Sequence, residues 1–171
     1  MSENKKALYS ARGLAMGGMV AAIYVVLTLI FQPISFGAIQ FRIAEALTLM
    51  PILTLDAVPG LFVGCLLANL LGGGVWFDVV LGSLATLLAA ICTRLMRDKP
   101  PIAAIFPTIF NGLIVGPVVY FAYVRAPGDP ISVSTLLFNM GTVAFGELVV
   151  CYVLGLPMVY GLKRLPEELF K

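Results

Sequence analysis

Four stretches of this sequence are long and strongly apolar, and they constrain the fold more than any other feature. They run over residues 13–31, 76–95, 102–123 and 136–160. A helix needs about 20 apolar residues to cross the hydrocarbon core of a bilayer, which is about 30 Å thick. The sequence therefore predicts an all-α integral membrane protein in which each of these stretches spans the lipid bilayer.

A further apolar region, residues 43–71, is interrupted in its middle. Thr54 and Asp56 are polar and Pro59 follows shortly afterwards. This is the pattern of a helix end followed by the N-cap and the first turn of another helix. We therefore predict two short helices in place of one span, over residues 43–55 and 57–71.

The distribution of basic residues supports this count of helices. Six transmembrane helices make a single membrane domain over residues 1–171 with both termini on one side. That side then carries nine of the eleven Lys and Arg residues: Lys5, Lys6, Arg12, Arg94, Arg97, Lys99, Lys163, Arg164 and Lys171. Because basic residues favour the cytoplasmic side, we expect cytoplasmic N and C termini. We also expect the first apolar stretch to be retained, since it is too long for a signal peptide.

The composition excludes several classes of function. Of the 171 residues, 60% are hydrophobic, 12% are charged and none is His, which excludes Ser-His-Asp catalysis and imidazole metal sites. No P-loop motif is present, so energy from ATP must come from a partner. A net charge of +2 is too small for a nucleic-acid surface. The isolated cysteines, which we interpret as small buried residues and not metal ligands, are Cys65, Cys92 and Cys151.

Most polar residues of the apolar helices fall in the outer half of the membrane. Asn111 and Glu147 lie nearer the midplane, and the inner halves are almost wholly aliphatic. The pattern predicts a pocket open to the outside and closed below by an apolar plug, since polar groups in the bilayer usually face a cavity. An ion pore would instead distribute them along its path. The outer residues are Gln40, Arg42, Glu45, Asn69, Trp76, Asp78, Tyr120, Tyr123 and Asn139.

The charged residues of this set have structural interpretations as well as a ligand-binding one. Arg42 and Glu45 are three residues apart on one helix and are able to neutralise one another. Asp78 lies near a helix start, where it would serve as a cap. Glu147 is the hardest to explain structurally, because an unpaired carboxylate at that depth is costly; it contacts a ligand or belongs to a buried pair.

The uncharged residues of the set also have two interpretations. Asn69 and Asn139 either contact a ligand or join helices through hydrogen bonds. Trp76 either stacks on a ligand or belongs to the aromatic belt at the membrane interface. The sequence leaves these alternatives open.

The first apolar stretch carries two adjacent pairs of small residues. Gly17 and Ala21 form one pair, and Gly18 and Ala22 form the other. Small residues four positions apart allow the backbone of a second helix to approach closely. The second helix belongs either to this bundle or to a partner protein.

Three segments together resemble a known family. They are residues 40–48 (QFRIAEALT), 56–73 (DAVPGLFVGCLLANLLGG) and 78–90 (DVVLGSLATLLAA). The chain resembles the QueT family over residues 11–161. These proteins are queuosine-precursor-binding (S) components of energy-coupling factor (ECF) transporters. Leu55 departs from the pattern, because family members often carry proline after the threonine.

The resemblance implies a fold, a function and partners. S components are non-enzymatic six-helix proteins of the prokaryotic cell membrane that capture a vitamin-like substrate from outside. They work with a transmembrane coupling subunit (T component) and two cytoplasmic ATPases, and have no cofactor of their own. The loaded S component is thought to topple in the membrane. The family contacts its coupling subunit through small residues of the first helix, which here match Gly17, Gly18, Ala21 and Ala22.

A 7-deazaguanine substrate would match the polar residues chemically. Its adjacent ring N–H and exocyclic amine donate as a pair, which a carboxylate accepts, and Glu45 is our first candidate. Arg42 or Asn69 would donate to the carbonyl, and a cationic aminomethyl group would need a second carboxylate, Asp78 or Glu147. Further hydrogen bonds and ring stacking are expected from Gln40, Asn139 and Trp76.

Three competing hypotheses remain. The nearest is an S component for another vitamin or flat heterocycle. A second is an integral-membrane enzyme that uses Glu45, Asp78 and Glu147 as acid, base or metal ligands, although the absence of His and the spread of these acids along the chain argue against it. A third is a purely structural assembly subunit that binds no ligand.

Overall fold

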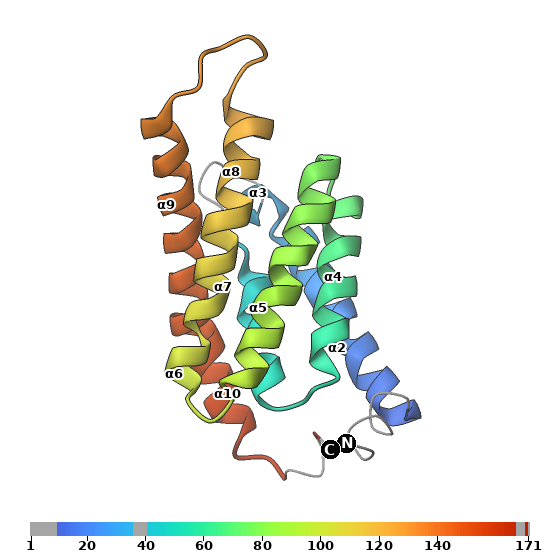
Figure 1. Cartoon of the computed structure of the whole chain (residues 1–171). Helices are drawn as coiled ribbons and strands as arrows, with labels where there is room; N and C mark the ends of the chain where they lie inside the picture. Colours follow the sequence, from blue (N-terminus) through green and yellow to red (C-terminus); the bar gives the residue numbers. More distant parts are fainter. Residues whose placement is uncertain (1–9, 36–40, 167–169, 171) are drawn as a thin grey trace.

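The computed structural model describes residues 10–35, 41–166 and 170, and these residues form helices and connections without any strand (Figure 1). Four helical stretches are long and apolar enough to cross a membrane: α2 (Ala11–Ile30), Asp78–Leu95, Pro100–Val124 and Val133–Leu162. The four spans expected from the sequence are therefore present, with ends shifted by a few residues.

The long stretches are not uniform α-helices. π-helical turns interrupt each of the last three, and such turns occur often at functional sites. The Asp78–Leu95 stretch consists of η2 (Asp78–Gly82) and α5 (Ser83–Leu95). The Pro100–Val124 stretch consists of α6 (Pro100–Ala103), α7 (Ile105–Phe110), η3 (Asn111–Val115), α8 (Gly116–Val119) and η4 (Tyr120–Val124). The Val133–Leu162 stretch consists of α9 (Val133–Val149), η5 (Val150–Gly155) and α10 (Leu156–Leu162).

The interrupted region forms two short helices, as its sequence predicts. They are the 3₁₀ helix η1 (Ile43–Ile52) and α4 (Ala57–Leu71). Asp56 occupies the N-cap position of α4, but its side chain makes no capping hydrogen bond; Thr54 Oγ1 instead lies 3.3 Å from Asp56 Oδ2. A one-turn helix, α3 (Gln32–Ser35), follows α2 and was not among the six expected helices.

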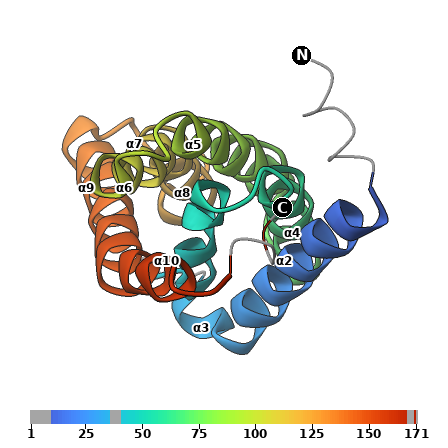
Figure 2. The same ribbon diagram turned by 90° about the horizontal axis from the view of Figure 1, so that it is seen from below.

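Helix η1 lies inside the bundle. In Figure 2 the cyan segment runs within a ring that α2, α4, α5, α7, α9 and α10 form around it. Residues 44–52 are all buried. At about 2.0 Å per residue, a 3₁₀ helix of this length is shorter than the hydrocarbon core of a membrane. A 3₁₀ helix of ten residues is unusually long, because its hydrogen-bond geometry is poorer than that of an α-helix. Packing against the surrounding helices therefore stabilises η1 more than its own hydrogen bonds do.

Two of the four small residues noted in the first helix, Gly17 and Ala21, lie in the contact between α2 and α4. A Cβ atom added to Gly64 would lie 2.9 Å from Ala21 Cα, and one added to Gly60 would collide with Gly17 O. Gly17 and Ala21 therefore pack inside the bundle. Gly18 is exposed, as is Ala22, and a Cβ at Gly18 would meet nothing within 4 Å.

A second close contact joins the Pro100–Val124 stretch to α9, and the sequence analysis did not identify it. Gly112 and Gly116 are four residues apart and face α9. Added Cβ atoms would lie 2.9 Å from Ala144 Cβ and 2.6 Å from Met140 Cα. Both halves of the bundle thus use small residues to bring helix backbones together.

The two ends of the bundle differ in character. The start of α2, the connection from α5 to α6 and the end of α10 lie at one end, at the bottom of Figure 1. These segments carry Arg12, Arg94, Arg97, Lys99, Lys163 and Arg164. At the same end an apolar core closes the bundle where the sequence predicts an apolar plug, and it consists of Leu49, Ile52, Ala103, Ala104, Cys151, Leu156 and Val159.

Candidate functional site

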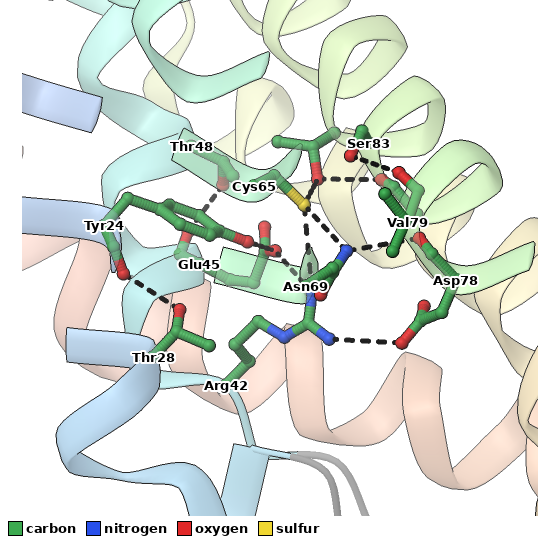
Figure 3. A network of polar contacts seen from close by, with 12 residues as sticks. Tyr24, Thr28, Arg42, Glu45, Thr48, Cys65, Asn69, Asp78, Val79 and Ser83 are labelled. Carbon is green, nitrogen blue, oxygen red and sulfur yellow. Dashed lines mark hydrogen bonds and ion pairs between the residues drawn. The ribbon is translucent and has the colours of Figure 1, made fainter. Parts of the chain in front are cut away.

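A buried polar network lies at the start of η1, and its members come from α2, η1, α4 and the helix formed by η2 and α5 (Figure 3). Arg42 is its cation. Arg42 Nη1 lies 4.0 Å from Glu45 Oε1, and Nη2 lies 3.9 Å from Asp78 Oδ2. None of the three side chains is more than 5% exposed. The i,i+3 pair expected from the sequence is therefore present, and the fold adds a second carboxylate from 36 residues further along the chain.

Asp78 is a member of this network and not a helix cap. It lies within the first turn of η2, where Phe77 occupies the cap position and no side-chain capping bond is formed. Its side chain is fully buried, and neither carboxylate oxygen makes a hydrogen bond in the described chain. Gly82 allows its close approach, since a Cβ there would lie 3.0 Å from Asp78 Oδ1.

Asn69 joins two helices and also faces the network. Its Nδ2 donates to the backbone oxygen of Asp78 at 3.2 Å, which ties α4 to η2. Its side-chain oxygen lies buried without a hydrogen bond in the described chain. The amide therefore has the structural role considered for it, and it also retains an acceptor for a ligand.

Tyr24 is a network residue that the sequence analysis missed. Its hydroxyl donates a short hydrogen bond to Glu45 Oε1, and Thr28 Oγ1 donates to the Tyr24 carbonyl at 2.9 Å. Tyr24 follows Gly17 and Ala21 by seven and three residues, so it lies on the same inward face of α2. The three- and seven-residue separations of Tyr24 from Ala21 and Gly17 can be read in the sequence, and they indicate that the Tyr24 side chain lies on the same helix face as these two small residues.

Cys65 also has a larger role than a small apolar residue. It is fully buried, as expected, but its sulfur lies within contact distance of three donors. These are Thr86 Oγ1 at 3.3 Å, Asn69 Nδ2 at 3.5 Å and Arg42 Nη1 at 3.9 Å. The thiol therefore links α4, α5 and η1. Nothing in the spacing of the cysteines indicated this role.

Glu147 and Asn111 approach the network from the C-terminal half of the chain. Glu147, on α9, is 6% exposed, and Asn111, at the start of η3, is 3% exposed. Glu147 interacts electrostatically with Glu45 and Arg42, and the Asn111 amide lies near both carboxylates. Asn111 Nδ2 makes no hydrogen bond of ordinary length in the described chain. The fold thus adds a third carboxyl group, that of Glu147, and the amide of Asn111 beside the network of Arg42, Glu45 and Asp78.

Two residues proposed from the sequence, Trp76 and Asn139, lie outside this network, and a third proposed residue falls outside the described residues. Trp76 is 66% exposed and stacks on Phe77, with ring centroids 3.7 Å apart, so its ring faces the surface. Asn139 Nδ2 donates to Thr135 O, one turn earlier on its own helix, at 2.8 Å. Gln40 lies outside the described residues. Trp76 thus occupies the position of an interfacial aromatic residue.

The network has an excess of hydrogen-bond acceptors. Five buried oxygen atoms in the network and on the adjacent Glu147 make no hydrogen bond in the described chain, namely Glu45 Oε2, Asn69 Oδ1, Asp78 Oδ1, Asp78 Oδ2 and Glu147 Oε2. A buried polar atom without a partner is costly, so a ligand that donates hydrogen bonds would stabilise this site. No group of three or more Cys, Asp or Glu side chains in the described ranges is arranged to hold a metal ion.

Comparison with known proteins identifies the family of this chain. The model of the QueT transporter family matches residues 14–164, which is most of the sequence. The chain belongs to the QueT transporter family. It is therefore a multi-pass membrane protein of a transporter family and not an enzyme, and the resemblance noted in the sequence is confirmed.

A curated relative of this QueT family member is the Queuosine precursor transporter QueT of Lactococcus lactis subsp. cremoris. The two are 38% identical over 83 residues, which is 47% of this chain and 48% of the relative. The match thus spans about half the length of the relative. No solved structure matches this chain.

Proposed function

We propose that this QueT family member is the substrate-capture (S) subunit of an ATP-driven ECF importer, and that it binds a queuosine precursor or related 7-deazaguanine from outside the cell. The family match and the name of the bacterial relative support this proposal. The observation that carries it is the acceptor-rich network around Arg42, Glu45 and Asp78, which is buried within the bundle.

The chemistry of the network suggests how a deazaguanine is held. Glu45 accepts the ring N–H and the exocyclic amine, since a carboxylate binds two adjacent donors in a bidentate arrangement. Tyr24 donates to Glu45 Oε1 and orients the carboxylate, leaving Oε2 without a hydrogen bond in the described chain. Arg42 donates to the ring carbonyl, and Asn69 accepts from the ligand through Oδ1, because its Nδ2 already bonds to Asp78 O and Cys65 Sγ. Asn139 and Gln40 are proposed for outer contacts.

We further propose that the chain crosses the membrane as six helices with cytoplasmic N and C termini. The four long stretches and the pair η1 and α4 supply the six. The basic segments at one end of the bundle support the orientation, because Lys and Arg concentrate on the cytoplasmic side. In this orientation a ligand would reach the buried network from the outer side, and the apolar core lies at the opposite, basic end.

The partners in this proposal are a T component and two cytoplasmic ATPases. The sequence has no P-loop, so hydrolysis must occur on another chain. The partner face proposed on α2 comprises Gly17, Gly18, Ala21 and Ala22. Since Gly17 and Ala21 pack against α4, Gly18 and Ala22 are the two members that remain exposed for direct contact.

Calorimetry on the purified full-length chain in detergent tests the proposal. We expect saturable binding of queuine or its aminomethyl and cyano deazaguanine precursors, and no binding of guanine. Glu45→Gln should weaken binding about tenfold or more, because it replaces a charged acceptor with an amide that also donates. Asp129→Asn, on an exposed connection, is the matched control and should bind normally. Folded protein that binds no deazaguanine would overturn the substrate assignment.

An S component for another vitamin or flat heterocycle is the second candidate. The acceptor-rich network fits any planar ligand with adjacent N–H donors, and it does not by itself identify a deazapurine. Competition between queuine and a panel of other flat heterocycles would distinguish the two. Displacement of bound queuine by one of them at lower concentration would favour the second candidate.

A further inference from the structure

Glu147 is a buried carboxylate that no cation of the described chain pairs with directly. The described residues place no Lys or Arg nitrogen within 4.0 Å of its carboxylate, and its Oε2 makes no hydrogen bond there. The side chain is only 6% exposed, so water does little to stabilise a charge on it. A carboxylate in such surroundings requires a positive charge or a proton close by.

The neighbours of Glu147 increase this requirement. Glu45 lies close enough to repel it electrostatically, and the nearest cation, Arg42, is already 4.0 Å from Glu45 and 3.9 Å from Asp78. In the described chain the Arg42 guanidinium therefore lies within 4.0 Å of two carboxylates and acts on Glu147 only from a greater distance. The thiol of Cys151, on η5, is also near Glu147 and supplies no positive charge.

Asn111 places an amide beside the two carboxylates. Its amide is 3% exposed and lies near both Glu45 and Glu147, yet its Nδ2 makes no hydrogen bond of ordinary length in the described chain. An amide carries no net charge, so it does not neutralise either carboxylate.

We propose that Glu147 binds a positively charged group of the ligand, so that the site selects a cationic precursor over a neutral one. This inference rests on the proposed deazaguanine function and makes it more specific. Of the two carboxylates considered for a cationic substituent, Asp78 is paired with Arg42, so Glu147 is the one assigned. The aminomethyl deazaguanine is then preferred over its cyano counterpart.

The test compares ligands that differ chiefly in charge. Calorimetry on the full-length chain would use 7-aminomethyl-7-deazaguanine, its near-isosteric hydroxymethyl analogue and the cyano compound. Wild-type protein should bind the aminomethyl compound about tenfold to hundredfold more tightly than the hydroxymethyl one. In Glu147→Gln the ratio of the two affinities should fall toward one, with little change for the neutral ligands. Asp98→Asn, which removes an exposed carboxylate, should leave the ratio unchanged.

Each alternative outcome has a definite meaning. Equal affinities for the charged and neutral compounds in wild-type protein would overturn the charge inference while leaving the deazaguanine function intact, and this comparison needs no variant to fold. An equal loss of all ligands in folded Glu147→Gln would assign Glu147 a positioning role and would also overturn it. Absence of binding by every deazaguanine would remove both the inference and the proposed function.

Discussion

The N-terminal and C-terminal halves of this bundle are packed alike but differ in polar content. In the first half α2 meets α4 through glycines, and in the second half η3 and α8 meet α9 in the same way. The residues labelled in the network of Figure 3 nevertheless all come from the first half. The second half contributes Asn111 and Glu147, which lie near Glu45, and Cys151, whose thiol lies 3.8 Å from the Glu45 carbonyl oxygen. The difference shows that close helix packing is general in this protein, whereas the polar site is assembled around η1.

The largest effect is expected from removing Arg42, the cation that the described residues place in the network. Arg42→Met should lower the free energy of unfolding by about 3–5 kcal/mol, because Glu45 and Asp78 would remain buried beside no positive charge. Unfolding of the detergent-solubilised protein by SDS in mixed micelles would measure the change. Arg97→Met is the control, with an expected change below about 0.5 kcal/mol, since its pair with Asp98 is exposed. Equal stability of wild type and Arg42→Met would show that Arg42 does not neutralise the carboxylates.

A second test asks whether the two halves are packed equally closely. Gly60→Ala and Gly116→Ala should each cost about 1–3 kcal/mol of stability, because the added methyl group meets backbone atoms of the facing helix. The same SDS titration would measure both. Gly18→Ala and Gly141→Ala are the matched controls and should be nearly neutral, since nothing lies within 4 Å of either added methyl. If only one half responded, the two halves would differ in packing as well as in polarity.

The smallest expected effect concerns the aromatic residue at the edge of the first half. Trp76→Phe should change deazaguanine affinity by no more than about twofold, because the indole is 66% exposed and lies outside the network. Calorimetry on the purified variant measures this change, with Trp76→Leu as a second substitution that removes the aromatic ring. A tenfold loss in both variants would restore the ligand-stacking role first considered for Trp76.

The sequence predicted which polar residues lie near one another better than it predicted how each side chain points. Arg42, Glu45, Asn69 and Asp78 were grouped by their positions along the apolar stretches, and the structure brings these four together. Which way a side chain points around its helix axis follows from packing. Trp76 points to the surface, and the Asn139 amide bonds to its own helix. The π-helical turns change the angle between successive residues, so regular periodicity does not predict the faces beyond them.

The amino-acid sequence by itself determined that this chain is a helical membrane protein with four long spans and a broken segment between the first two. Apolar length, polar breaks and basic ends are local properties, and the cost of placing polar groups in lipid makes them decisive. Only the tertiary structure decided that Tyr24, Cys65 and Asp78 surround the Arg42–Glu45 pair and that Gly17 and Ala21 face inward. These contacts join residues far apart in the chain, and they depend on how the helices pack around η1.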